Sequence, residues 1–144
     1  MTRSAANVKE AVPFFAIADM AASLRFYVDG LGFTVVNRWI VDEKIRWCLL
    51  TLDSASIMLQ QFGMGGEGSW VPSGKVGDGV SICFMCDDAI AMYHHAKARG
   101  LEVKRPFVGN GLWVTSLSDP DGYRLDFESP TDVSEETEYA DSAE

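Results

Sequence analysis

The feature that most constrains the fold is an internal duplication that spans most of the 144 residues. Residues 12–36 hold an apolar, strand-like run, then Asp19 as a helix cap, then a helical pattern that ends near two glycines. Residues 80–104 repeat this plan, with Asp88 as the helix cap and Gly100 directly after the last helical turn. The chain is therefore expected to fold as two similar halves.

Each helical segment is followed by further strand-like runs. These lie at 38–41, 46–52 and 57–62 in the first half, and at 101–103, 104–108, 112–117 and 123–127 in the second. Each half therefore reads βαβββ, and an α+β domain is predicted in which each helix covers one face of its sheet. The spacing of Leu24, Tyr27 and Leu31 predicts an apolar stripe that packs on Phe15 and Ile17.

The two halves define the expected domain boundaries. Residues 1–10 form an N-terminal extension and residues 11–129 one domain, made of module one (11–62), a glycine-rich linker (63–79) and module two (80–129). No apolar stretch approaches the roughly 18 residues that a membrane span needs, which excludes a membrane protein. Charged residues near the N-terminus also argue against a signal peptide, so a cytoplasmic location is predicted.

The net charge of −9 is concentrated at the C-terminus. Residues 129–144 contain six acidic and no basic side chains, so the rest of the chain is only mildly acidic. No basic stripe is present to neutralise phosphates, and nucleic acid is excluded as a partner. Residues 130–144 are expected to be a solvated, mobile acidic tail that aids solubility, with binding of a protein partner as the alternative.

Three cysteines are present, Cys48, Cys83 and Cys86, and a cytoplasmic location favours free thiols. The last two spell C-x-x-C, but they lie in a strand-like run whose residues i and i+3 point to opposite faces. A zinc site would need a second ligand pair that the sequence lacks. The prediction is buried structural cysteines without redox or metal chemistry.

Three strings carry a resemblance to a known family. They are DMAASLRFYVDGLGF from Asp19, FMCDDAIAMYHHAKARGLEV from Phe84, and DPDGYRLDF from Asp119 to Phe127. Together they resemble the vicinal oxygen chelate (VOC) superfamily, which includes glyoxalase I, bleomycin resistance proteins and extradiol dioxygenases. The resemblance covers roughly residues 11–129. It implies paired βαβββ modules that form a curved mixed sheet around a cavity, with the helices on the outer face, and a homodimer that completes the cavity.

The enzymes of this superfamily hold a metal at four inward-facing positions. The resemblance maps these positions to Val12, Gln60, Ser81 and Asp126, of which only Asp126 is a good ligand for a divalent metal. The two histidines, His94 and His95, are adjacent on a helix and point about 100° apart, so surface or packing roles are favoured for them. No cofactor is therefore expected, and a divalent metal is the alternative.

The expected cavity lining is apolar and aromatic, with a few polar groups. The candidate ligand-binding residues are Phe14, Met58, Gln60, Phe62, Trp70, Met85, Trp113, Arg124, Asp126 and Glu128. Arg124, Asp126 and Glu128 alternate along one strand face, and a solvated ion-pair ladder is the other interpretation of that pattern. Trp47 is assigned to the core. No catalytic residue is identified.

Three hypotheses for function follow. The first is binding of a small aromatic or amphipathic organic molecule, without the usual metal quartet, by a homodimer. The second is a metal-dependent VOC enzyme, a lyase, isomerase or dioxygenase, with an unusual site around Gln60 and Asp126 and with Glu128 as a further candidate. The third is a protein-interaction module that uses the acidic tail.

Overall fold

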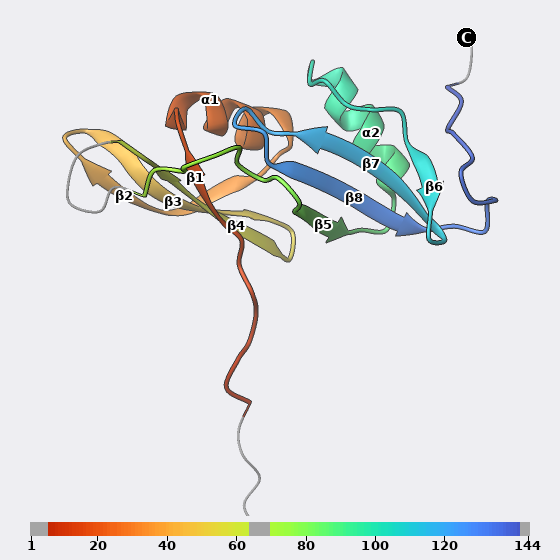
Figure 1. The fold of residues 1–144 in the computed structure, drawn as a ribbon, viewed down its shortest axis with the longest axis horizontal. Helices are drawn as coiled ribbons and strands as arrows, with labels where there is room; N and C mark the ends of the chain where they lie inside the picture. Colours follow the sequence, from red (N-terminus) through yellow and green to blue (C-terminus); the bar gives the residue numbers. More distant parts are fainter. Residues whose placement is uncertain (1–5, 64–69, 142–144) are drawn as a thin grey trace, which may run out of the picture.

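The computed structural model describes residues 6–63 and 70–141 and contains two four-stranded sheets (Figure 1). Module one consists of β1 (Phe14–Ile17), α1 (Met20–Leu24) with its π-helical continuation η1 (Arg25–Gly30), β2 (Thr34–Val41), β3 (Lys44–Leu52) and β4 (Ala55–Gln61). Module two consists of β5 (Ser81–Met85), α2 (Ala89–Ala98), β6 (Phe107–Gly109), β7 (Leu112–Ser118) and β8 (Arg124–Pro130).

The two sheets have equivalent topologies, which confirms the repeated βαβββ plan. Their strand orders are β1-β4-β3-β2 and β5-β8-β7-β6. In both, the first strand pairs in parallel with the last, whereas the remaining pairs are antiparallel. The α+β class is as predicted, but the strands form two separate mixed sheets and not one continuous curved sheet.

Both helices begin at the aspartates that the sequence singles out. The Asp19 carboxylate accepts a hydrogen bond from the Ala22 N–H, and the Asp88 carboxylate accepts one from the Ala91 N–H. Gly100 follows α2 with φ +81°, the left-handed conformation that favours glycine. Among the described residues, no helix is both long and apolar enough to cross a membrane.

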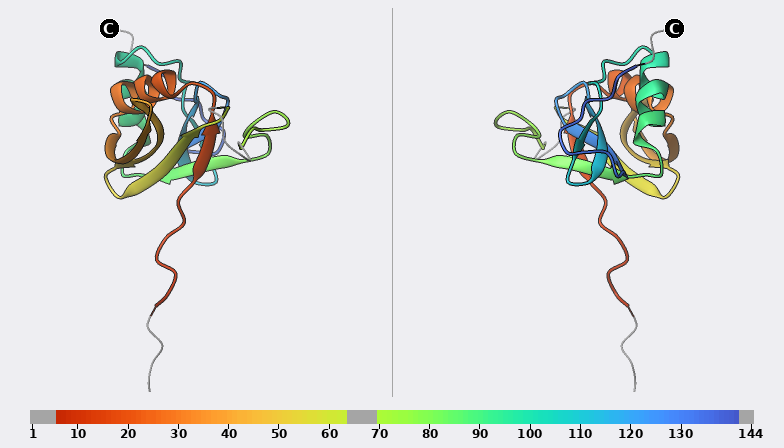
Figure 2. Two further views of the ribbon diagram at one scale, coloured as in Figure 1. Left: turned by 90° about the vertical axis from the view of Figure 1, so that its left-hand side faces the viewer. Right: turned by 90° about the vertical axis from the view of Figure 1, so that its right-hand side faces the viewer.

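The helices lie on the same side of the two sheets (Figure 1). Tyr27 and Leu31 are buried against Phe15 and Ile17, as the helical spacing predicts. This helix-covered side forms the hydrophobic core, which continues through both modules as far as Phe127. On the opposite side of the sheets the described part of the chain places no helix, and we call this side the open face (Figure 2).

A turn in module two joins the modules. The Tyr27 hydroxyl donates to the Asp119 carboxylate at 2.6 Å, across 92 residues of sequence. The other Asp119 oxygen accepts three backbone N–H groups of its own turn. The Tyr123 ring stacks on Phe15 at 4.2 Å, and its hydroxyl donates to the Ala16 carbonyl. These contacts fix the two open faces relative to each other.

The predicted strands at 101–103 and 104–108 are wrong except at the very end, because β6 begins only at Phe107. Pro106 has no N–H to donate to a ladder, and the Lys104 N–H bonds to the Ser116 carbonyl outside any regular pairing. Leu101 instead packs against the hydrophobic core. The segment therefore serves packing between the helix and the sheet.

The described part of the C-terminal segment is largely exposed, as expected for an acidic tail, but it also hydrogen bonds to module two. The Glu136 N–H bonds to the Val108 carbonyl at 2.8 Å, and the Tyr139 N–H bonds to the Pro106 carbonyl at 2.8 Å, so this segment runs along the outer edge of β6. The Glu135 carboxylate accepts the N–H groups of Asn110 and Gly111. Figure 1 shows this segment beside β6, whereas residues 6–13 extend away from the body.

Candidate functional site

The open face of module one is apolar and aromatic. Strand register places Phe14 beside Met58 and Leu49, and Gln60 beside Trp47, so these side chains share one face. Phe14 is 40% exposed and Trp39, farther along the sheet, is 52% exposed. Because the other face is covered by helix, this is the surface on which module one can receive another molecule.

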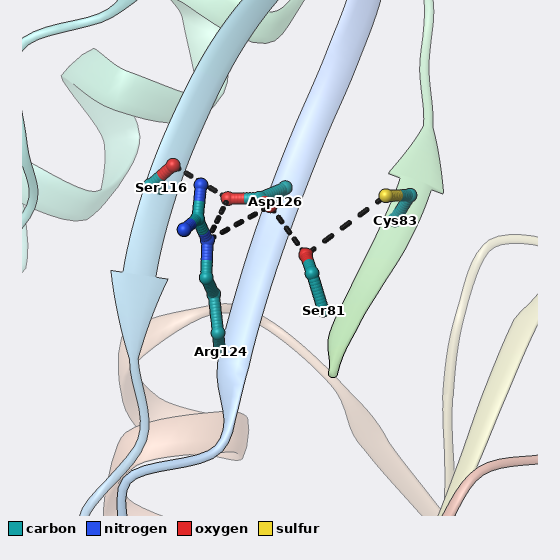
Figure 3. Close-up of polar contacts among 5 residues, drawn as sticks. All are labelled: Ser81, Cys83, Ser116, Arg124 and Asp126. Carbon is teal, nitrogen blue, oxygen red and sulfur yellow. Dashed lines mark hydrogen bonds and ion pairs between the residues drawn. The ribbon is translucent and has the colours of Figure 1, made fainter. Parts of the chain in front are cut away.

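The open face of module two carries a polar cluster (Figure 3). Its centre is Asp126 on β8, which is only 4% exposed. The Asp126 carboxylate accepts hydrogen bonds from the hydroxyls of Ser81 on β5 and Ser116 on β7. It also pairs with the Arg124 Nε at 3.0 and 3.1 Å. The buried charge of Asp126 is thus fully compensated, as a buried carboxylate requires.

Cys83 extends the cluster along β5 and is exposed, so the prediction of a buried thiol is wrong for this residue. The reason is that β5 is an edge strand of its sheet and that Cys83 lies on the uncovered face. Its sulfur lies 3.9 Å from the Ser81 hydroxyl. Partial burial and a hydrogen bond to Glu128 raise the pKa of the Cys83 thiol, which makes it a weak nucleophile.

The four positions that the family uses for metal do not fit a divalent cation in this chain. Val12 has no ligand atom, and the Ser81 hydroxyl and the Asp126 carboxylate are engaged with each other. A different trio, Cys83, Asp126 and Glu128, brings its ligand atoms within 4.8 Å of one another. The Arg124 guanidinium lies against Asp126 at 3.0 Å, however, and its positive charge opposes a metal ion at that carboxylate.

A cavity of about 340 Å³ lies where the two modules meet, and we call it the junction cleft. It is lined by Pro13, Phe14, Phe15, Lys75, Gly77, Asp78, Val80, Ile82, Tyr123 and Arg124. The Trp70 ring lies 4.5 Å from the Phe14 ring at its border. The loop that follows Trp70 stands out from the body on the side away from α2 (Figure 2). Both open faces therefore reach this cleft.

Most of the residues predicted for the site lie on the open face or at the cleft. Phe14, Trp70 and Arg124 meet at the junction cleft, Met58 and Gln60 lie on module one, and Met85, Asp126 and Glu128 lie on module two. Phe62 follows β4 and is half-buried. Trp113 is the exception: it pairs with Ser129 on the helix side of its sheet and packs against Tyr139.

Three residues of this region are not among the site residues that the sequence predicts. The sequence predicts a core position for Trp47, but the buried Cys48 and Leu50 occupy the helix side of β3 and leave Trp47 on the open face. Strict alternation along that strand was the signal that would have placed it there. Lys75, the single basic residue of the linker, and Tyr123 line the cleft without any local pattern that marks them.

Structural comparison supports the fold. The chain resembles TioX from Micromonospora sp. ML1 (TM-score 0.69, 18% identity, covering 85% of this chain and 99% of that one). It resembles TnmS3, an antibiotic binding protein from Streptomyces sp. CB03234 (TM-score 0.63, 21% identity, 88% and 100%). It also resembles a bleomycin-binding protein in complex with bleomycin (TM-score 0.62, 23% identity, 85% and 98%).

Sequence comparison with curated proteins gives no match. A family model, however, matches residues 11–127, which include both modules and the linker between them. That span contains the two capped helices, the polar cluster and the junction cleft described above. The chain therefore belongs to the Glyoxalase/Bleomycin resistance protein/Dioxygenase superfamily.

Proposed function

We propose that this protein binds a small aromatic or amphipathic organic molecule over its open faces, and that a homodimer completes the binding cavity. The observation that carries the proposal is the uncovered aromatic and apolar surface: Phe14, Trp39 and Met85 are 40%, 52% and 64% exposed on the open face. Large apolar groups gathered on one face mark a binding surface more often than a solvent-facing one.

The chemistry of this surface suits a flat organic ligand. Aromatic side chains such as Trp47 and Phe14 offer a large contact area to another ring. The compensated polar cluster around Asp126 supplies a few oriented hydrogen-bonding groups, which fix a ligand's orientation more than its affinity. Two of the proteins with this fold are described as antibiotic-binding and bleomycin-binding, which supports a small-molecule role at the level of the fold.

The metal-dependent alternative has less support from these residues. Asp126 is the one strong ligand at the family positions, and it is held by Arg124 and two serine hydroxyls. Elemental analysis of the purified protein after exposure to Mn, Fe, Co, Ni and Zn tests this alternative. Stoichiometric metal that is lost in Asp126→Asn would favour the enzyme and count against the binding protein.

The third hypothesis, a protein-interaction tail, is also weakened. Among the described residues, the carboxylates of Glu135 and Asp141 bond within the chain, and Glu138 forms a long ion pair with Arg105. A partner would have to displace these contacts. If a chain that lacks the tail binds an organic ligand as tightly as the full-length chain, ligand binding does not require the tail.

Quenching of tryptophan fluorescence tests the proposal directly. The protein is titrated with a panel of polycyclic aromatic compounds, and the titration is repeated with Trp47→Phe and with Trp113→Phe. Because Trp47 lies on the open face and Trp113 on the helix side, bound ligand should quench Trp47 but not Trp113. The quenching amplitude is therefore expected to fall in Trp47→Phe and to persist in Trp113→Phe.

Two results would count against the proposal. One is the absence of saturable quenching with any compound of the panel at concentrations where the protein remains folded. The other is quenching that disappears only in Trp113→Phe, which would place the ligand on the helix side and not on the open face.

A further inference from the structure

We infer that the junction cleft recognises an anionic group, such as a carboxylate, sulfonate or phosphate, carried by the aromatic ligand, through the Arg124 guanidinium and the Lys75 ammonium. This inference rests on the proposed function for the aromatic part of the ligand. The ligand is expected to be negatively charged, with its charge held in the junction cleft.

Arg124 occupies a central position for this role. It lines the junction cleft and two adjacent cavities of about 330 and 410 Å³, so its side chain is the common wall of three openings. Its Nε atom bonds to Asp126 at 3.0 Å, which holds the guanidinium in place. Among the described residues, no hydrogen bond occupies its two terminal nitrogens. Four of its five N–H donors are thus free for a ligand.

The ion pair with Asp126 prepares Arg124 for binding and does not disable it. A guanidinium that is bonded through Nε still presents both terminal nitrogens in the planar fork that matches a carboxylate or sulfonate. The pair as a whole is close to neutral, so it attracts an anion by hydrogen bonding more than by net charge. A second cation is needed to balance the charge of the ligand.

Lys75 provides that cation. It lines the junction cleft and the adjacent cavity together with Arg124. The Ser118 hydroxyl lines that adjacent cavity as a further donor. Among the described residues that line these two cavities, Asp78 is the one acidic residue, and it is exposed. Asp126 balances the charge of Arg124, and Asp78 is a solvated carboxylate. An anion at this point is therefore favoured by the hydrogen-bond donors of Arg124, Lys75 and Ser118 more than by net charge.

The apolar wall of the same cleft lies next to these donors. Phe14 and Tyr123 line it, Tyr123 stacks on Phe15, and Trp70 contacts Phe14. A ligand that places a ring on Phe14 has its substituents within the cavity that Arg124 and Lys75 border. The arrangement of an aromatic surface beside a cationic pair therefore selects an aromatic acid over a neutral aromatic molecule of the same size.

A matched pair of probes tests the inference on the full-length chain. Anilinonaphthalene sulfonate and N-phenylnaphthylamine share the same arylamine skeleton, and only the first carries a sulfonate. Fluorescence titration and calorimetry give the affinity and the stoichiometry for each. The expected result is one sulfonate probe per chain, bound roughly tenfold or more tightly than the neutral probe, since charge-assisted hydrogen bonds are the stronger ones.

Variants locate the effect. Lys75→Gln and the double variant Arg124→Met with Asp126→Asn should each lower affinity for the sulfonate probe by a larger factor than affinity for the neutral probe, so that the ratio of the two affinities falls toward one. The double variant removes both members of the ion pair, so that no buried charge remains alone. Lys44→Gln is the control of equal charge change, because Lys44 begins β3 and lines no part of the cleft.

The outcomes separate this inference from the proposed function. Equal affinities for the two probes in the wild-type protein would overturn the anion site and leave the binding of aromatic ligands standing. A preference for the sulfonate that survives in Lys75→Gln and in the double variant would also overturn it. If neither probe binds, the inference and the proposed function both fail.

Discussion

At the residue scale, the buried carboxylate of Asp119 joins the two modules. Asp119 accepts the Tyr27 hydroxyl from module one and three backbone N–H groups from its own turn. Burial raises the pKa of Asp119, while the hydrogen bonds from Tyr27 and the backbone oppose that rise. The pKa of Tyr27 is raised by burial and by the same carboxylate. The position of the junction cleft thus depends on this buried pair.

Replacing Asp119 with Ala should lower the free energy of unfolding by about 2–4 kcal/mol, because it leaves a buried tyrosine hydroxyl and several N–H groups without partners. Asp121→Ala is the control, since Asp121 accepts only the exposed Ala18 N–H in the described part of the chain. Urea denaturation of both variants measures the difference. Equal stability of the two variants would show that Asp119 does not join the modules.

The raised pKa of Asp119 also predicts a pH dependence. A carboxyl whose pKa in the folded state lies above its ordinary value of 3.8 binds a proton more tightly when folded. Its contribution to stability is therefore complete below pH 3.8 and is lost as the pH rises through the folded-state pKa. Asp119→Asn removes this titration. The stability of the wild-type protein minus that of Asp119→Asn should fall as the pH rises, and a difference that grows would contradict the assignment.

The three thiols should differ in reactivity. Cys48 is fully buried and its pKa is raised to about 11, so only about one thiol in a thousand is ionised at pH 8. The pKa values of Cys83 and Cys86 are both raised, but Cys83 is exposed whereas Cys86 is half-buried, so access of the reagent decides their order. Ellman's reagent at pH 8 should label Cys83 first and Cys48 only on unfolding. Rapid labelling that persists in Cys83→Ser would count against this order.

At the scale of elements, the C-terminal segment acts as an extra layer on module two. It hydrogen bonds along β6, while Tyr139 lies between His94 and Trp113, and Asp141 bonds the Tyr93 hydroxyl. The acidic composition of this segment pointed to a solvated tail. The charge of the segment does not predict the contacts of Tyr139, because its partners His94 and Trp113 lie on α2 and β7, which are distant in sequence.

Removal of residues 131–144 should therefore destabilise the protein. The loss of the hydrogen bonds to β6 and of the Tyr139 contacts is expected to lower Tm by several degrees, at roughly 4 °C per kcal/mol for a chain of this size. Removal of residues 142–144 alone, which keeps every contact named above, is the control. Calorimetry measures both, and equal Tm values would show that the segment adds no stability.

At the same scale, local signals predicted the repeated elements well. Asp19 and Asp88 cap their helices because a capping carboxylate acts within three residues, and such signals are visible in sequence. The site was harder to predict. The glycine-rich neighbours of Trp113 favour a position at the cavity, but the register of β7 places Trp113 on the helix side of its sheet. The junction cleft depends on the packing of two modules, which no local pattern encodes.

At the scale of the whole molecule, the uncovered open face predicts association of two copies. Sedimentation equilibrium should give the mass of a dimer at micromolar concentration. Trp39→Ser should raise the dimer dissociation constant about tenfold or more, because Trp39 is a large exposed aromatic group at the edge of this face. Val8→Ser, at the exposed N-terminal end, is the control. A monomer at all concentrations, or a dimer indifferent to Trp39→Ser, would contradict this prediction.

The outer edge strands of the two sheets, β2 and β6, differ in whether another segment covers them. The edge of β6 is occupied by the chain's own C-terminal segment, whereas β2 runs for eight residues as an outer edge strand with Val36, Trp39 and Ile40 exposed. A molecule with a single uncovered edge strand can pair through that edge with only one other copy. Loss of the C-terminal segment, for example by proteolysis after Pro130, would leave the edges of both β2 and β6 uncovered, and we then expect chains to associate edge to edge.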